Sequence, residues 1–195
     1  YKLFTEQCYN LLRKGGYCGI VIPSGIYSDL GSKQLREMLF ENSQITGIFG
    51  FENRKEIFEG VHRSFKFVVL SFEKGGLTKS FPAAFMRHDV EELENFPHFG
   101  SVEITLDFIR KQSPDSLSVM EVKEEIDFVI ADKLLKFPSL GSDEKGSWQL
   151  VLHREFNMTD DAPLFNKQPL KGALPLYEGK MIWHFTHLLA EPRYW

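Results

Sequence analysis

Residues 51–72 have the sequence Phe51-Glu-Asn-Arg-Lys-Glu-Ile-Phe58-Glu-Gly-Val-His62-Arg63-Ser-Phe65-Lys66-Phe67-Val-Val-Leu-Ser-Phe72. Charged residues and one aromatic side chain, Phe58, separate two apolar runs that are typical of β-strands. Loops that join rigid strands often carry binding residues. Local composition alone favours an ordinary turn with solvated charges. The sequence around this stretch must therefore decide between a turn and a binding loop.

The first 75 residues alternate between helix and strand patterns. A first helix is predicted by apolar side chains at helical spacing, namely Phe4, Cys8, Leu11 and Leu12. Residues 17–23 then form an apolar run typical of a buried strand. A second helix, capped by Ser32, is predicted to turn three side chains inward: Leu35, Met38 and Leu39. Strands at 45–51 and 64–72 complete a helix-covered α/β sheet, the last two pairing antiparallel at one sheet edge.

The pattern changes after residue 76. A strand is predicted at 79–88, a short helix at 104–112 and a longer helix at 121–136. The apolar stripe of the longer helix consists of Val122, Ile126, Val129, Ile130 and Leu134. Residues 141–147 are rich in Gly, Ser and charge and are expected to form a linker or exposed loop. Strand-like pieces follow at 149–153 and 179–185.

Composition and charge limit the class of protein. The 195 residues are 43% hydrophobic, which is ample for a buried core. No apolar run approaches the ~20 residues that cross a membrane, and the sequence shows neither a signal peptide nor a disulfide framework, so we expect a cytoplasmic protein. Residues 1–75 carry ten Lys or Arg against eight Asp or Glu, whereas residues 89–160 carry seven against sixteen. A nucleic-acid surface is therefore expected in the first part or near the C-terminal end.

Several motifs, taken in order, resemble one enzyme family. They are Gly15-Gly-Tyr-Cys-Gly-Ile-Val-Ile-Pro23, a helix with Leu35-Arg36, residues 51–58, and His62-Arg-Ser-Phe-Lys-Phe-Val68. This order resembles adenine-specific DNA methyltransferases, in particular the large fused restriction-modification and phage-defence enzymes. Leu174-Pro-Leu-Tyr-Glu-Gly-Lys-Met-Ile182 is similar to the point where such enzymes enter their target-recognition domain. The resemblance is strong over residues 1–75 and 174–183 and weak between them.

The resemblance implies a fold, a domain order and an activity. Residues 1–76 would hold the late strands of a partial Rossmann-like, S-adenosylmethionine-dependent methyltransferase sheet. Residues 77–170 would form a mixed α+β linker region, and residues 171–195 would begin the recognition domain. The parent enzyme would transfer a methyl group from S-adenosylmethionine to adenine in double-stranded DNA. A fused or associated endonuclease, as in type II restriction enzymes, would be a further partner.

The resemblance also assigns roles to residues of the loop. Such enzymes turn the target adenine out of the duplex and hold it between aromatic side chains. Phe58 occupies the position of one of these aromatics, although a hydrophobic plug under the loop is the alternative. Four basic side chains of this region are the expected contacts to DNA phosphates: Arg54, Lys55, Arg63 and Lys66. His62 and Lys180 are further candidates for DNA contact.

Two features of the family are missing from these residues. The sequence contains no Asn-Pro-Pro-Tyr motif and no Gly-rich strand-to-helix turn for S-adenosylmethionine. We therefore expect a piece of a longer protein that holds no catalytic residue and is inactive alone. No metal site is expected, because His184 and His187 have no third ligand nearby. Two alternatives remain: a non-catalytic DNA-recognition or assembly module, and an unrelated nucleotide-binding α/β protein.

Overall fold

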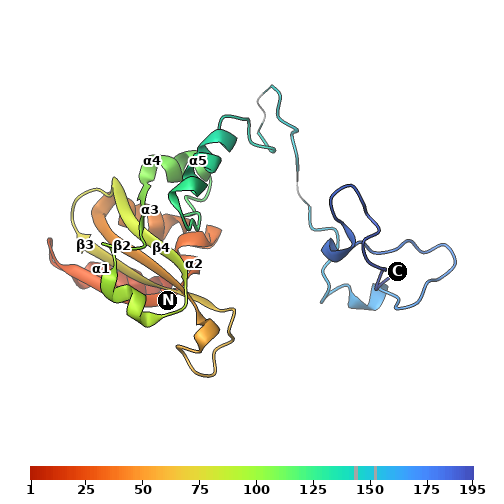
Figure 1. Cartoon of the computed structure of the whole chain (residues 1–195), viewed down its shortest axis with the longest axis horizontal. Helices are drawn as coiled ribbons and strands as arrows, with labels where there is room; N and C mark the ends of the chain where they lie inside the picture. Colours follow the sequence, from red (N-terminus) through yellow and green to blue (C-terminus); the bar gives the residue numbers. More distant parts are fainter. Residues whose placement is uncertain (143–144, 152) are drawn as a thin grey trace. The chain divides into compact units, whose positions relative to one another are not determined.

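Five strands form one mixed sheet in the first of the two units into which the chain divides, Tyr1–Ser139 and Leu140–Trp195. The computed structural model describes residues 1–142, 145–151 and 153–195 (Figure 1). The strands are β1 (Tyr17–Pro23), β2 (Ser43–Glu52), β3 (Lys66–Lys74), β4 (Ser80–Arg87) and β5 (Val102–Thr105). Their order is β1-β3-β2-β4-β5. The prediction of an α/β fold is confirmed.

The carboxyl ends of the neighbouring parallel strands β2 and β4 lie at the same end of the sheet. β3 is antiparallel to both β1 and β2, β2 is parallel to β4, and β5 is antiparallel to β4. β1, β2 and β4 therefore run in one direction. In open α/β sheets, ligands bind beyond the carboxyl ends of such strands. The loop after β2 leaves the sheet at this edge.

The prediction that the last two strands form a hairpin at the sheet edge is half right. β2 and β3 do pair antiparallel, with Phe51 opposite Phe67. They lie inside the sheet, however, because β1 pairs with the other side of β3 and β4 with the other side of β2. The apolar runs of both strands fit this central place, since side chains on both faces are buried.

The core lies on both faces of the sheet. Along β3, Val68 and Leu70 belong to one apolar cluster, whereas Phe67 and Val69 belong to another. Successive side chains of a strand point to opposite faces, so the two clusters cover the two faces. The smaller cluster contains Phe49, Phe51, Phe67 and Ala84, with Ile57, Val69, Leu93 and Phe96 packed against it.

The first helix packs by a face that only partly coincides with the predicted one, because Cys8 and Leu12 are partly buried. α1 (Lys2–Leu11) confirms the predicted helix, but Phe4 and Leu11 are exposed, and Thr5 is the buried residue. Lys74 explains the orientation: its Nζ donates to the carbonyl oxygens of Tyr9 and Leu12 and lies 4.5 Å from the centroid of the Tyr9 ring. This contact turns the face with Thr5 and Tyr9 toward the sheet.

Strand β1 is less buried than its apolar sequence suggests. Tyr17 is 68% exposed and Val21 is 51% exposed. The prediction of a buried strand is therefore wrong for one of its faces: alternate residues from Tyr17 to Val21 are exposed, and only Ile22 is fully buried. In the chain, β1 is followed by α2 (Gly25–Ser28) and by a short 3-10 turn, η1 (Leu30–Ser32).

Helix α3 (Lys33–Asn42) begins after Ser32, as predicted, and buries Leu39 together with Phe40. Leu35 and Met38 are partly buried against the core. The hydroxyl of Ser32 makes no capping hydrogen bond, so this part of the prediction is wrong. Sequence reasoning missed the buried Arg36 on this helix.

The guanidinium of Arg36 joins two loops. It donates to the carbonyl oxygens of Ile26 and Asp29, each at 2.8 Å, and to that of Ser116 at 2.6 Å. A buried cation needs such partners, and burial lowers the pKa of Arg36. These three hydrogen bonds of Arg36 hold the turn after β1 next to the segment that precedes α5.

The chain after residue 76 extends the same sheet. β4 confirms the strand predicted at 79–88, and β5 was not predicted. α4 (Leu106–Gln112) starts later than expected, because the first residues of the predicted helix belong to β5. The assignment of residues 77–170 and 171–195 to separate functional parts stays a prediction.

The long helix is shorter than predicted. α5 runs over Glu125–Leu134, and the buried Val122 precedes it. Much of the predicted stripe is exposed, whereas Ala131 is the buried residue of the helix. The exposed members are Ile126, Val129, Ile130 and Leu134.

The second unit holds little regular structure in the part that is described. It contains the 3-10 turns η4 (Ala162–Leu164) and η5 (Gly179–Met181). The strand predicted at 179–185 is wrong, because an isolated bridge between Trp183 and Thr186 is the only pairing found there in the described residues. The described residues of 149–153 form no strand, and residue 152 lies outside them, as do 143–144 of the predicted loop. Within the described residues, no helix has the length and hydrophobicity of a membrane span.

Candidate nucleic-acid interface at the loop between β2 and β3

The loop of residues 53–65 joins the carboxyl end of β2 to the start of β3. Figure 1 shows it in gold, extending away from the sheet. It opens with the 3-10 turn η2 (Asn53–Lys55), and Glu56 follows in the left-handed region with φ of 55°. The backbone N–H of Asn53 donates to the carbonyl oxygen of Phe65 at 2.9 Å, which closes the base of the loop. The predicted binding loop is thus a distinct structural feature.

Phe58 is half-exposed in this loop, and its ring contacts the sheet at the ring of Phe67. Its exposed fraction is 44%. Its ring meets Phe67 edge to face, with centroids 4.9 Å apart and an angle of 79°. Phe67 in turn stacks on Phe51 at 5.1 Å. One side of the Phe58 ring is therefore supported by core aromatics, while the remainder is open to solvent.

Each of the four lysine and arginine side chains predicted to contact phosphate in this region has an acidic partner in the structure. Arg54 Nε lies 2.6 Å from Glu52, and Arg63 Nε lies 3.0 Å from Glu56. Two more pairs join the loop region to other elements, Lys55 with Asp89 and Lys66 with Glu121. Three of the four cations are largely exposed, namely Arg54, Lys55 and Arg63.

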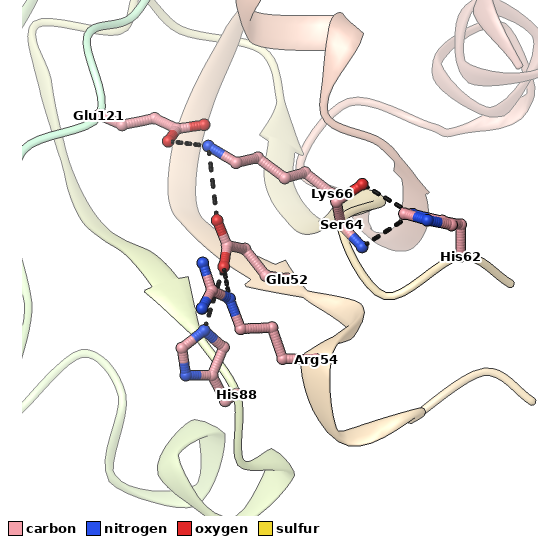
Figure 2. Close-up of polar contacts among 7 residues, drawn as sticks. All are labelled: Glu52, Arg54, His62, Ser64, Lys66, His88 and Glu121. Atoms are coloured by element: carbon pink, nitrogen blue, oxygen red, sulfur yellow. Dashed lines mark hydrogen bonds and ion pairs between the residues drawn. The ribbon is translucent and has the colours of Figure 1, made fainter.

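Glu52 is the centre of the polar network drawn in Figure 2. It accepts a hydrogen bond from Arg54 and contacts His88 Nε2 at 3.2 Å. Lys66 Nζ lies 3.9 Å from the same carboxylate and 2.6 Å from Glu121. The network thus joins the ends of β2 and β4 to the start of β3 and to the segment before α5.

The network shifts the pKa of two groups. The hydrogen bond from Arg54, followed by that from His88, lowers the pKa of Glu52. Burial raises the pKa of Tyr27, and its hydrogen bond to Glu121 at 2.7 Å adds to the effect. Glu52 is therefore ionised and Tyr27 is neutral at neutral pH. Glu121 accepts from both Tyr27 and Lys66 and so holds the turn after β1 near the start of β3.

The remaining predicted contacts have different surroundings. His62 Nδ1 lies 2.8 Å from Ser64 Oγ and accepts from the backbone N–H of Ser64 at 3.2 Å. Nδ1 of His62 is therefore the acceptor in this short turn. Lys180 belongs to the other unit and pairs with Glu178 at 3.0 Å. The structure therefore gathers Arg54, Lys55, His62 and Arg63 on one loop with Lys66 at the start of β3, whereas Lys180 belongs to the other unit.

Sequence reasoning missed the residues that organise the loop. Asn53 is fully buried, although it begins an exposed connection. Glu52 and Glu121 pair with Arg54 and Lys66. His88, which directly follows β4, contacts the Glu52 carboxylate. A polar pair directly after an apolar strand, Glu52-Asn53, was the available signal. The described residues include no cluster of three His, Cys, Asp or Glu side chains that could hold a metal ion.

One protein family matches part of the chain, and several solved structures share its fold. Residues 1–58 match the family model of the Eco57I restriction-modification methylase. No curated protein matches the chain. The M protein of the type I restriction enzyme EcoKI is similar over 69% of this chain and 41% of its own, with 16% identity and a TM-score of 0.51.

Two further structures are similar. A chain of a type I restriction-modification system, studied for complex assembly and conformational transition, is 16% identical over 69% of this chain and 36% of its own, with a TM-score of 0.50. The type IIG restriction endonuclease BpuSI is 27% identical over 43% of this chain and 10% of its own, with a TM-score of 0.36. The chain spans less than half the length of each of these proteins. At 16% identity, the likenesses to the EcoKI M protein and to the chain of the type I system concern the fold alone.

Proposed function

We propose that this chain contributes the late strands of the catalytic domain of an adenine-specific DNA methyltransferase. In the intact protein, the methyl group would pass from S-adenosylmethionine to adenine in double-stranded DNA. The match of residues 1–58 to a restriction-modification methylase family and the likeness of the sheet to type I subunits support this proposal. A restriction or phage-defence role, with a fused or associated endonuclease, follows from the same resemblance.

The observation that carries the proposal is the placement of Phe58. Its ring stands half-exposed on a loop beyond the carboxyl end of β2, where ligands of α/β sheets bind, and Phe67 supports one side of it. A flipped base offers a flat face to such a ring, and stacking contributes about 1–3 kcal/mol per base. We therefore assign the 53–65 loop to one wall of the adenine pocket, with Phe58 as the stacking side chain.

The loop cations would act on the DNA backbone near this pocket. Arg54, Lys55, Arg63 and Lys66 are the candidates, and His62 is a further candidate for a DNA contact. Because each of the four cations has a carboxylate partner, a phosphate would compete with that partner when DNA binds. We expect each cation to contribute less than an unpaired surface lysine or arginine would.

Catalysis and cofactor binding are assigned mainly to residues beyond this chain. The 195 residues contain no Asn-Pro-Pro-Tyr sequence, whose side-chain and carbonyl oxygens would accept hydrogen bonds from the adenine amino group. We propose that the chain by itself transfers no methyl group. Methylation of DNA by the purified 195-residue chain would contradict this part of the proposal.

Replacement of Phe58 in the intact parent protein tests the stacking role. Phe58→Ala is expected to lower methyl transfer to DNA by about 5- to 150-fold, the rate equivalent of one lost stacking contact. Phe58→Trp should retain most of the activity, because a larger ring still stacks. Phe99→Ala, which removes an aromatic side chain that is 81% exposed, is the control. Equal activity of Phe58→Ala and the wild type would rule out the stacking role.

A second candidate is a non-catalytic assembly module. The exposed apolar side chains of α5 favour it, because contiguous apolar surface is typical of protein contacts. This candidate predicts that the intact protein binds a protein partner but neither methylates DNA nor depends on Phe58. Loss of partner binding in an Ile126→Asp, Ile130→Asp variant, with no methyl transfer by the wild type, would favour it over methylation.

A further inference from the structure

Asn53 combines a polar side chain with complete burial. It is the first residue after β2 and has an exposed fraction of 0%. Most of the loop that follows is exposed. A buried amide costs free energy unless its donors and acceptor are paired. The partners of Asn53 therefore show what the residue holds in place.

All three partners of the Asn53 side chain are backbone groups of the loop. Its Nδ2 donates to the carbonyl oxygens of Phe58 and Val61, each at 2.9 Å. Its Oδ1 accepts from the backbone N–H of Phe58 at 2.9 Å. The partners also fix the orientation of the amide, because a reversed amide would turn Oδ1 toward two carbonyl oxygens.

This arrangement fixes Phe58 on both sides of its Cα atom. The N–H and the carbonyl oxygen of Phe58 bond to the same amide group, so the backbone at this residue has little freedom to rotate. Glu56 N–H donates to the Asn53 carbonyl oxygen at 2.9 Å and tightens the turn before Phe58. The ring of Phe67 contacts one side of the Phe58 ring and so limits its movement.

We propose that Asn53 is a positioning residue, whose amide holds the Phe58 ring in the orientation that receives the flipped base. This inference rests on the stacking role proposed for Phe58. A ring that is ordered before the base arrives avoids the entropy loss of ordering it during binding. No other side chain reproduces the three bonds: Asp lacks both donors, and Gln is longer by one methylene.

A double-mutant cycle in the intact parent protein separates positioning from general stability. The variants are Asn53→Ala, Phe58→Ala and the pair together, measured by transfer of labelled methyl groups from S-adenosylmethionine to DNA. If Asn53 acts through Phe58, Asn53→Ala lowers kcat by a factor similar to that of Phe58→Ala, and the double variant is no slower than Phe58→Ala alone. Independent, multiplicative losses would overturn the proposal, as would full activity of Asn53→Ala.

Thr78→Val is the matched control for the cycle. Thr78 is also buried and also bonds to backbone, but at the amino end of β2. Its replacement should lower stability and multiply with Phe58→Ala, because it does not touch the loop. If Thr78→Val and Asn53→Ala couple equally to Phe58→Ala, the effect of Asn53 is general and the positioning role is wrong.

Hydrogen exchange of the intact protein makes failure of this inference distinct from failure of the stacking role. Asn53→Ala should remove the protection of the Phe58 amide while the amides of β2 and β3 keep theirs. If Phe58→Ala leaves methyl transfer unchanged, the stacking role is wrong, whatever the exchange shows. If Phe58→Ala is slow but Asn53→Ala is fast, only the positioning role is wrong. Asn53→Asp, which keeps the bond from Phe58 N–H, gives the same comparison should the Ala variant not fold.

Discussion

A buried polar side chain lies at each end of β2, Thr78 at the amino end and Asn53 at the carboxyl end, but the two form hydrogen bonds with different parts of the chain. At the amino end, Thr78 Oγ1 donates to the carbonyl oxygen of Ser43 at 2.6 Å and accepts from Ile45 N–H at 3.0 Å. At the carboxyl end, Asn53 bonds within its own loop, to Phe58 and Val61. Thr78 therefore links distant parts of the core, whereas Asn53 shapes a surface segment.

This difference separates two consequences of burying a polar group. A bond between distant elements contributes to the free energy of global unfolding. A bond within one loop contributes mainly to the free energy of local opening, which is smaller in exposed segments. The amino end of β2 is thus built for stability, and the carboxyl end for the geometry of a ring on the surface.

The largest effect is expected where the loop meets the core. Phe67→Ala removes a ring that is 6% exposed and that contacts both Phe51 and Phe58. We expect the free energy of unfolding to fall by about 3–5 kcal/mol, as for other buried aromatics. Urea denaturation measures it, with the exposed Phe99→Ala as control. A loss below about 1 kcal/mol would mean that the carboxyl end does not rest on the core as described.

The next effect tests the amino end alone. Thr78→Val leaves Ser43 C=O and Ile45 N–H without their side-chain partner, so the free energy of unfolding should fall by about 2 kcal/mol. Exchange of the loop amides should not change. Thr159→Val, at an exposed position, is the control. If the loop amides exchange faster in Thr78→Val, the two ends are coupled and the comparison fails.

A smaller, pH-dependent effect is expected for Glu52. Its pKa in the folded protein is lowered from an ordinary value of 4.5, so its stabilising contribution is present above that pH and is lost as the pH falls through the folded value. Glu52→Gln should therefore be less stable than the wild type at pH 7, by less than about 1 kcal/mol. The difference should shrink below pH 4.5. Urea denaturation at several pH values measures it, and a constant difference would exclude this role.

The smallest effect concerns the exposed pair of Arg63 with Glu56. Glu56→Gln should leave the unfolding midpoint unchanged while freeing Arg63 for a phosphate. DNA binding by the intact protein should then depend more steeply on salt, with the slope changing by up to about 0.9 for one added contact. Glu59→Gln, on the same loop, removes the same charge and is the control. Equal slopes for the two variants would show that the ion pair does not restrain Arg63.

The sequence predicted most of the elements that carry the site. The apolar runs of β2, β3 and β4 and the Phe58 loop were all placed correctly, because strand and turn patterns depend on neighbouring residues. Contacts from distant residues were not predictable in this way. Lys74 sets the face of α1, and Glu121 meets Lys66 across 55 positions of the chain.

Residues 1–75 by themselves determined the α/β class, the family resemblance and the choice of Phe58, because these follow from local periodicity and from motif order. The tertiary structure alone decided that β3 lies between β1 and β2, that the loop cations are paired with acids, and that Asn53 is buried. The physical reason is that strand order, ion pairing and burial depend on which distant segments meet. Local sequence constrains each segment, whereas the satisfaction of buried polar groups is settled only when the segments pack together.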